Sequence, residues 1–447
     1  MSSMNRREFM KTASAAAAAA SVGTFSINAV GANEKVVLGV MGIHGRGMAL
    51  AEGFGKRPDV ELKYVCDVDS NLFKDRVPQI AKWIGKEPQT LMDFRKMCDD
   101  PDIDGIVMAT PNHWHALATV LACQAGKDVY VEKPVAHNIW EGRKMVEAAR
   151  KYNRVVQVGT QNRSAEYCYA AADYVRSGKL GDIHFVRIMN SKGRSIVPDT
   201  PDEETPAGVD YDMWLGPAPA RKFNRNHFHY AWNWFWNYGA GDISNDGIHQ
   251  IDLARWVMGN PTYPKSVYST GGIHFFKDAQ ETPDTHCVNW DFDGLTVVFE
   301  QSLWSPYLQK TPIEKRNDDE LPVWPHCGTR AEIYGTKNFM YLGRHGDGWE
   351  VFDADWKRVD MKPGRFTNDE HFANFVDCIR TRKEPNADIE KVHISTNWGH
   401  YGNVSYRLGR KLFIDPATEG FINDDEANAD LTYRRQYREP WVVPETV

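Results

Sequence analysis

A cluster of glycines after an apolar run is the first feature of this sequence that could do chemistry. Residues 36–47 read V-V-L-G-V-M-G-I-H-G-R-G. Gly42 would form a tight turn, and Gly47 would let a following helix pack close to a strand. His44 stands at the middle position of the fingerprint, with Gly45 beside it. This is an imperfect form of the pattern that binds the pyrophosphate of a dinucleotide.

Asp67 supports a dinucleotide site. It follows the stretch 61–66 and lies 20 positions after Gly47, where a carboxylate would accept hydrogen bonds from an adenosine ribose. A carboxylate there would repel a 2′-phosphate, so the sequence favours NAD over NADP. An acidic strand end without a ligand is the alternative.

The elements that would position these residues alternate between strands and helices. Apolar stretches with the character of buried parallel strands cover 36–41, 61–66, 103–109, 128–131 and 155–159. Helical stretches between them predict a Rossmann domain, which we place at 33–160. The carboxyl ends of such strands face the ligand crevice, so we expect two loops near the cofactor: Thr110-Pro111-Asn112-His113-Trp114-His115 and Glu132-Lys133-Pro134.

Histidines supply the candidates for proton transfer and for metal binding. His249 is the best general-base candidate, because the unperturbed pKa of histidine suits proton removal from a hydroxyl at neutral pH. A packed structural histidine is the alternative. The pairs His113/His115 and His227/His229 have H-x-H spacing, but no third ligand has a matching spacing, so we expect no metal site.

The stretch 223–238 is rich in aromatic and amide side chains. From Trp232 to Tyr238, five of seven positions are aromatic, which is unusual for core in so polar a run. Flat apolar rings stack on the C–H face of a sugar while amides bind its hydroxyls. We therefore expect Trp234 and Trp236 to contact a carbohydrate. An aromatic structural loop or subunit contact is the alternative.

Bulk properties narrow the class of protein. The 447 residues are enough for two domains, and a net charge of −7 argues against a nucleic-acid partner. The seven cysteines are scattered singly, which indicates neither a disulfide framework nor a structural zinc site.

The N-terminus has the features of an export signal. Arg6 and Arg7 form a twin-arginine pattern, and a weakly apolar, alanine-rich run follows. We interpret residues 1–32 as a cleaved twin-arginine signal and expect a periplasmic or secreted protein with no membrane attachment after processing. The run is too short and too alanine-rich to hold a bilayer well.

The remainder, 161–447, predicts a second domain of α+β type. Strands are expected at 183–189, 267–271, 286–292 and 295–303, a hairpin at 331–342, and long helices at 369–381 and 394–413. Residues 310–326 predict a long loop, and the polar tail after 415 should wrap the surface. The whole is an α/β protein: an N-terminal Rossmann domain, then an α+β domain with an open, mostly antiparallel sheet.

Taken in order, these motifs resemble the Gfo/Idh/MocA oxidoreductases, a family that includes glucose–fructose oxidoreductase and inositol dehydrogenase. The resemblance extends over nearly the whole chain after the signal. It rests on the glycine cluster, Asp67, the loop 110–115, E-K-P at 132–134, G-I-H-Q-I-D at 247–252, and 374–385 with 402–410.

The resemblance implies roles for individual residues. Lys133 is the active-site lysine, whose charge would stabilise a developing alkoxide, and His249 is the catalytic histidine. The family often has Asp where this chain has Asn245, which cannot act as a base. The cofactor should be bound by Gly42, His44, Gly45, Arg46, Gly47, Asp67, Thr110, Pro111, Asn112, His115, Glu132 and Lys133. The substrate should be bound by Asn162, Arg163, Trp234, Trp236, Asn245, Asp246 and His249.

The implied activity is NAD(P)-dependent oxidation of a hydroxyl on a sugar, polyol or glycoside, in a homo-oligomer. An exported enzyme has no replenished NAD pool, so we expect the cofactor to stay bound and to be recycled. A redox-neutral glycosidase, which oxidises, eliminates and reduces again, is the first alternative. A non-catalytic sugar-binding protein is the second, and the presence of Lys133 and His249 argues against it.

Overall fold

The computed structural model describes residues 35–366, 368–431 and 437–447. The proposed signal, 1–32, lies outside the described residues. Among the described residues, none of the helices has the length and apolar character needed to span a membrane.

The first domain is built on a six-stranded sheet, in the order β3-β2-β1-β4-β5-β6, with every pair parallel. Strands β1, β4, β5 and β6 are almost wholly buried, which explains their continuous apolar sequence. The strands are β1 (Val36–Met41), β2 (Val60–Cys66), β3 (Gln89–Leu91), β4 (Gly105–Met108), β5 (Asp128–Val131) and β6 (Val156–Val158), and the helices are α2 (Gly45–Gly55), α3 (Phe73–Ile84), α4 (Arg95–Asp99), α5 (Asn112–Gln124) and α6 (Ile139–Lys151).

This strand order reverses direction between β1 and β4, which is the point where open α/β sheets bind ligands. The short strand β3 is missing from the sequence prediction. Helix α3 contains Pro78 without a break.

The second domain is built on a nine-stranded sheet, in the order β14-β13-β12-β11-β7-β10-β9-β8-β15, in which only β10 and β7 are parallel. The predicted fold class is therefore confirmed. The strands are β7 (Ile183–Ser191), β8 (Ser266–Gly272), β9 (Thr285–Phe292), β10 (Leu295–Ser302), β11 (Arg330–Gly335), β12 (Phe339–Gly343), β13 (Trp349–Phe352), β14 (Arg358–Lys362) and β15 (Leu412–Phe413).

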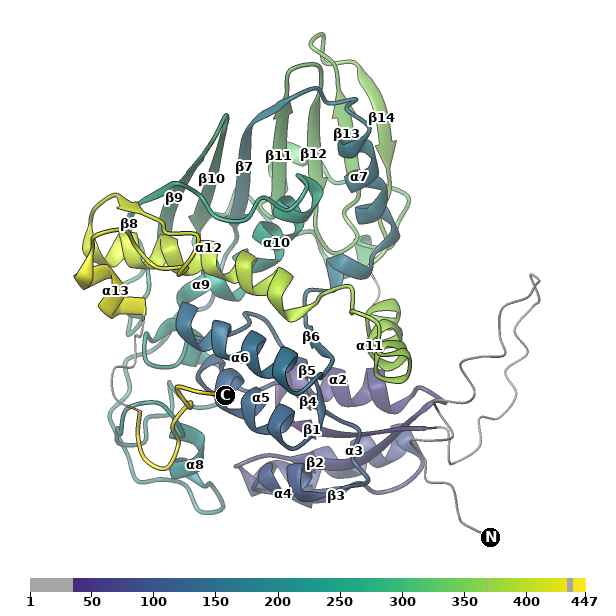
Figure 1. Ribbon diagram of the computed structural model, residues 1–447, viewed down its shortest axis with the longest axis vertical. Helices are drawn as coiled ribbons and strands as arrows, with labels where there is room; N and C mark the ends of the chain where they lie inside the picture. Colours follow the sequence, from purple (N-terminus) through teal and green to yellow (C-terminus); the bar gives the residue numbers. More distant parts are fainter. Residues whose placement is uncertain (1–34, 367, 432–436) are drawn as a thin grey trace, which may run out of the picture. The chain divides into compact units, whose positions relative to one another are not determined.

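Helices α7 (Glu166–Arg176), α10 (Gly247–Val257) and α12 (Ile389–Leu408) lie along this sheet (Figure 1). Along β9 the buried residues His286, Val288 and Trp290 alternate with the exposed Cys287 and Asn289, so the helices cover one face and leave the other open. Shorter helices complete the described chain: α8 (Tyr211–Leu215), α9 (Gly241–Asn245), α13 (Asp425–Leu431), and the single turns η3 (Ser70–Leu72), η4 (Gln161–Ser164), η5 (Ala231–Trp234), η6 (Ile313–Lys315) and η7 (Trp324–His326).

Segments late in the sequence return to the first domain. Helix α11 (Asp369–Thr381) packs on α2, where the rings of Phe54 and Phe372 lie 4.4 Å apart. Near the C-terminus, Trp441 contacts Trp114 of α5 at 5.3 Å between ring centroids and is buried together with Val443. The expectation of a polar tail on the surface is thus corrected, because these apolar side chains anchor it in the Rossmann core.

A buried carboxylate, that of Glu419, connects its own segment to three others. Glu419 accepts hydrogen bonds from Arg143 of α6, from the hydroxyl of Tyr263, and from Nε2 of His393 in α12 at 2.9 Å. These donors hold the pKa of Glu419 well below its usual range, although burial alone would raise it. The cluster therefore stabilises the junction of both domains with the tail.

We expect the substitution Glu419→Gln to lower the free energy of unfolding at neutral pH by about 2 kcal/mol, because three donors lose a charged acceptor. Since the folded state depresses this pKa, the contribution is complete above the ordinary value of 4.5 and is lost as the pH falls below it. Urea unfolding at neutral and acid pH measures both effects. The exposed Glu426→Gln is the matched control, and equal stability of the two variants would contradict the role of Glu419.

Candidate active site

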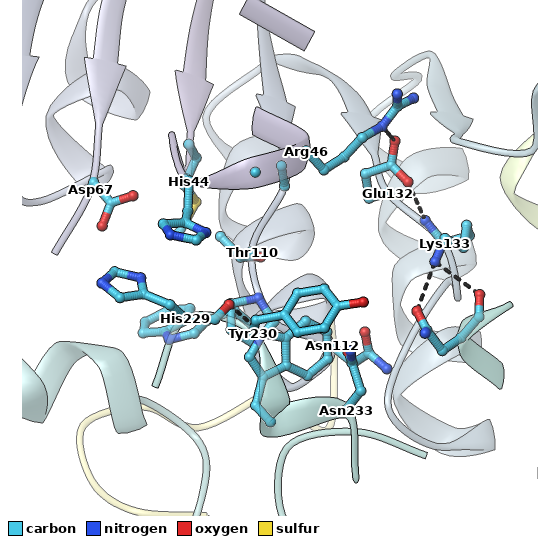
Figure 2. A pocket seen from close by; sticks show the side chains of 18 of the residues that line it. His44, Arg46, Asp67, Thr110, Asn112, Glu132, Lys133, His229, Tyr230 and Asn233 are labelled. Carbon is cyan, nitrogen blue, oxygen red and sulfur yellow. Dashed lines mark hydrogen bonds and ion pairs between the residues drawn. The ribbon is translucent and has the colours of Figure 1, made fainter. Parts of the chain in front are cut away.

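A cavity of about 490 Å³ lies at the carboxyl ends of β1, β2, β4 and β5 and is closed by residues of the second domain. Thirteen of the residues predicted from sequence line it: Gly42, His44, Gly45, Arg46, Asp67, Thr110, Pro111, Asn112, Glu132, Lys133, Asn245, Asp246 and His249. Figure 2 shows Asp67, His44 and His229 toward one side of the pocket and Lys133 with Glu132 toward the other. A volume of this size suits a small-molecule site.

The glycine loop has the geometry that close approach of a phosphate needs. Gly42 has a φ of +84°, and a Cβ on Gly47 would lie 1.7 Å from the carbonyl oxygen of Gly42, so larger residues are excluded from both positions. By contrast, a Cβ on Gly45 would meet nothing within 4 Å. The N-terminus of the 11-residue helix α2 therefore opens on free space, as anion binding requires. Gly47 itself packs behind the loop.

Asp67 is held rigidly at the end of β2. Its carboxylate accepts hydrogen bonds from the backbone N–H of Ile43 at 2.8 Å and of Asp69 at 3.0 Å. Burial raises the pKa of Asp67 above its usual value, and these two bonds counter part of that rise. A fixed carboxylate with free lone pairs is suited to binding the hydroxyls of a ribose.

A segment of the second domain reaches across this end of the cavity. The imidazole of His229 stacks on that of His44, with 4.5 Å between ring centroids, and its Nε2 lies 2.8 Å from the carboxylate of Asp69. Burial and the neighbouring His229 lower the pKa of His44. The adjacent Tyr230 also lines the cavity. The two domains therefore enclose the predicted nucleotide end from opposite sides.

Two predicted cofactor ligands pair with each other. Nε of Arg46 donates to Glu132 at 2.7 Å, so their charges cancel at the cavity wall. His115 lies behind the wall, with its two ring nitrogens 2.8 Å from the carbonyl oxygen of Pro134 and 3.1 Å from that of Thr110. It therefore connects the two loops that carry the site and does not line the cavity.

Lys133 is fixed at the other end of the cavity. Its ammonium donates to the backbone oxygen of Asn245 at 2.8 Å and to the side-chain oxygen of Asn245 at 2.9 Å. The Lys133–Pro134 peptide bond is cis. Burial lowers the pKa of Lys133 from its usual value, while nearby carboxylates of Glu132, Asp246 and Asp242 oppose that shift.

Asn245 has a defined orientation. Its side-chain N–H donates to the carboxylate of Asp242 at 3.3 Å, which leaves its oxygen for Lys133. The residue that departs from the family pattern thus positions the lysine.

His249 lies in the same part of the cavity and is almost fully buried. Burial, His345 and Lys133 hold its pKa well below the usual value, so the ring is neutral at physiological pH and can accept a proton. Its ring contacts that of His345 at 4.4 Å between centroids. Asp252 does not orient this imidazole, because it forms a buried ion pair with Arg163.

Four predicted substrate ligands lie away from the cavity. Asn162 accepts a hydrogen bond from the backbone N–H of His345, and Arg163 forms a buried ion pair with Asp252. Trp234 packs in an apolar cluster, and Trp236 lies beneath the guanidinium of Arg407 at 5.4 Å. In the turn η5, Trp232 lines the cavity and Trp234 does not. Which of the two rings faces the cavity cannot be predicted from sequence, because the segment has no regular periodicity.

The cavity is also lined by residues that the sequence did not predict to be part of the site. They are Gln161, Lys192, His229, Tyr230, Trp232, Asn233, Lys310 and His345, among others. His345 lies in the turn between β12 and β13, where Gly343, Gly346 and Gly348 surround it; that glycine spacing could have marked a functional turn. Lys192 and Lys310 lie outside the helices and strands, and no sequence motif around them indicates a role in the site.

Comparisons with known proteins agree with this architecture. The family model described as "Oxidoreductase family, NAD-binding Rossmann fold" matches residues 35–160, and the one for its "C-terminal alpha/beta domain" matches 192–294 and 333–443. The crystal structure of an aldose-aldose oxidoreductase from Caulobacter crescentus, complexed with glycerol, superimposes with a TM-score of 0.63 at 17% identity, covering 85% of this chain and 100% of that one.

Curated relatives include two dehydrogenases and one glycosidase. The scyllo-inositol 2-dehydrogenase (NAD(+)) of Bacillus subtilis is 23% identical over 79% of this chain and 89% of its own length. Levoglucosan dehydrogenase of Pseudarthrobacter phenanthrenivorans is 28% identical over 43% of this chain and 42% of its own. An alpha-N-acetylgalactosaminidase of Shewanella oneidensis is 24% identical over 41% of this chain and 45% of its own length.

We expect the substitution His229→Ala to weaken NAD binding about tenfold, because the ring stack over His44 and the contact with Asp69 are both lost. Fluorescence titration with NADH, and the rate of NADH release, would measure the effect. The exposed His184→Ala in β7 is the matched control. An unchanged dissociation constant in His229→Ala would show that this segment does not hold the nucleotide.

Proposed function

Because the chain belongs to the Gfo/Idh/MocA oxidoreductase family, we propose that it is an NAD-dependent oxidoreductase acting on a hydroxyl of a sugar or polyol. One observation carries the proposal: Lys133 and His249 line one end of a cavity whose other end is formed by the glycine loop and Asp67. The open N-terminus of α2 and the fixed carboxylate of Asp67 fit a dinucleotide.

The residues of the cavity divide the chemistry between them. A bound nicotinamide would supply the hydride acceptor. The ammonium of Lys133 would donate a hydrogen bond to the reacting oxygen and stabilise its developing negative charge. His249, neutral because burial lowers its pKa, would take the hydroxyl proton. Asn245 keeps Lys133 in place through two hydrogen bonds.

The substrate class rests on the relatives and on the cavity wall. The two dehydrogenases reported above are named for a polyol and for an anhydrosugar. The ring of Trp232 and the amide of Asn233 line the cavity, and an apolar face beside an amide suits a polyhydroxylated ring.

We further propose that the cofactor remains bound and is recycled, because the His44–His229 stack closes the nucleotide end of the cavity. Recycling is compatible with two outcomes. The first is oxidation of one sugar coupled to reduction of another. The second is the redox-neutral cleavage of a glycoside, which the relative named alpha-N-acetylgalactosaminidase favours as a second candidate function. Release of the aglycone without net oxidation would place the enzyme in the second class, and net oxidation without cleavage would place it in the first.

We propose export by the twin-arginine route, on the evidence of Arg6 and Arg7 in the N-terminal sequence. Replacing both with Lys should retain the chain in the cytoplasm, because the paired arginines are the recognised feature. Cell fractionation with immunodetection would measure this. Equal export of the unchanged chain and the double variant would contradict the route.

We expect the substitution Lys133→Met to reduce turnover at least about a thousandfold while NAD binding stays within about twofold, because the cation acts on the reacting oxygen. The assay is NADH formation across a panel of sugars and polyols, with NAD affinity measured separately. Lys82→Met, on the exposed side of α3, is the control. Full turnover in Lys133→Met would overturn the assignment.

A further inference from the structure

The reacting end of the cavity carries an excess of positive charge. Three lysine amines line it, from Lys133 after β5, Lys192 after β7, and Lys310 in the loop that follows β10. Behind them lie two buried arginines, Arg344 and Arg316. The carboxylates that face this group are Asp242, Asp246 and Asp347. Five cations against three carboxylates leave a net charge of +2.

The histidines at this end do not add to that charge, nor does the opposite wall cancel it. His249 and His345 are neutral, because burial holds both pKa values well below the usual range. Arg46 and Glu132 cancel each other in their own ion pair. The net positive charge therefore surrounds the part of the cavity beside Lys133.

Most of these cations have their hydrogen-bond partners within the protein. Arg344 forms a two-pronged contact with Asp246 at 2.9 and 2.7 Å. Lys192 lies 3.0 Å from Asp242 and also pairs with Asp246. Lys133 is held by Asn245. Asp246, predicted from the sequence to bind substrate, is therefore paired with the protein's own cations.

Lys310 differs from the others. The nearest carboxylate oxygen is Oδ1 of Asp246, 3.8 Å from its ammonium, which is beyond hydrogen-bonding distance. Its side chain is 38% exposed and lines the cavity. Burial and the neighbouring Arg344 lower its pKa to about 8. Asp246, the carboxylate that faces this amine, is already hydrogen-bonded to Arg344 and paired with Lys192. An anion in the cavity would give Lys310 a hydrogen-bonded counter-ion of its own.

On the basis of the proposed function, we infer that the substrate is an anionic sugar, whose acidic group is bound by Lys310 with Lys192 beside it while a ring hydroxyl lies at Lys133 and His249. An anionic oxygen group would receive charge-assisted hydrogen bonds from the lysines, and such bonds are stronger than those between neutral groups. A neutral sugar would leave the surplus charge uncompensated. Lys310 is on this account a specificity-determining residue that plays no part in hydride transfer.

The test compares matched acidic and neutral sugars on the NAD-loaded protein by isothermal titration calorimetry. The probes are D-glucuronate against D-glucose and D-galacturonate against D-galactose, with glucose 6-phosphate and galactose 6-phosphate included to distinguish a carboxylate from a phosphate. We expect at least one acid to bind about tenfold or more tightly than its neutral partner, with a preference that declines as salt is added.

Variants assign that preference to the lysine. Lys310→Met should abolish the preference for the acid while affinity for the neutral sugar changes less than about twofold, and Lys310→Arg should retain most of it. Lys315→Met, an exposed lysine in the same loop, is the matched control and should behave as the unchanged chain.

Three results would overturn the inference: equal binding of acid and neutral sugar in every pair, no binding of any acid by protein that binds NAD, or an undiminished preference in Lys310→Met. These measurements record binding and not turnover, so they are separate from the proposed function. Failure of that function would instead appear as a protein that does not bind NAD or does not lose activity in Lys133→Met.

Discussion

The ammonium of Lys133 is the charge on which the rest of this site depends. It is carried by a loop of the Rossmann domain, yet both of its hydrogen-bond acceptors belong to Asn245 of the second domain. Asn245 is in turn fixed by Asp242, which also receives a bond from Asn190 in β7. A buried cation needs such partners, because desolvation without them would favour loss of its proton. This arrangement of Lys133 exists only when the two domains are joined.

That requirement accounts for several features of the fold. Chain segments distant in sequence cross the junction: α11 packs on α2, Glu419 connects α6 with α12, and Trp441 enters the Rossmann core. Each of these contacts joins a late segment of the chain to a helix of the Rossmann domain. Lys133 takes its hydrogen-bond acceptors from the second domain. A small displacement of the two domains would leave the lysine without acceptors, so this site requires a well-packed junction.

The parts of the site that sequence could predict are those encoded locally. Gly42, Gly47 and Asp67 follow from strand, turn and helix within one βαβ unit, and the structure brings Gly42 and Asp67 to the cavity with Gly47 packed behind. The parts that sequence could not predict depend on contacts between distant segments. Trp234 and Trp232 are two residues apart in an irregular stretch, and only tertiary packing decides which one faces the cavity. Lys310 lies in a long loop whose sequence has no regular periodicity, so its proximity to Asp246 could not be predicted from the neighbouring residues.

One measurement tests the central claim most directly, namely that this cavity holds a dinucleotide with its reacting end at Lys133. The chain should be expressed in the cytoplasm without residues 1–32, purified, dialysed and denatured, and any released nucleotide identified by absorbance and mass. The account predicts stoichiometric NAD(H). A protein that releases no nucleotide and does not bind added NAD or NADP would contradict it.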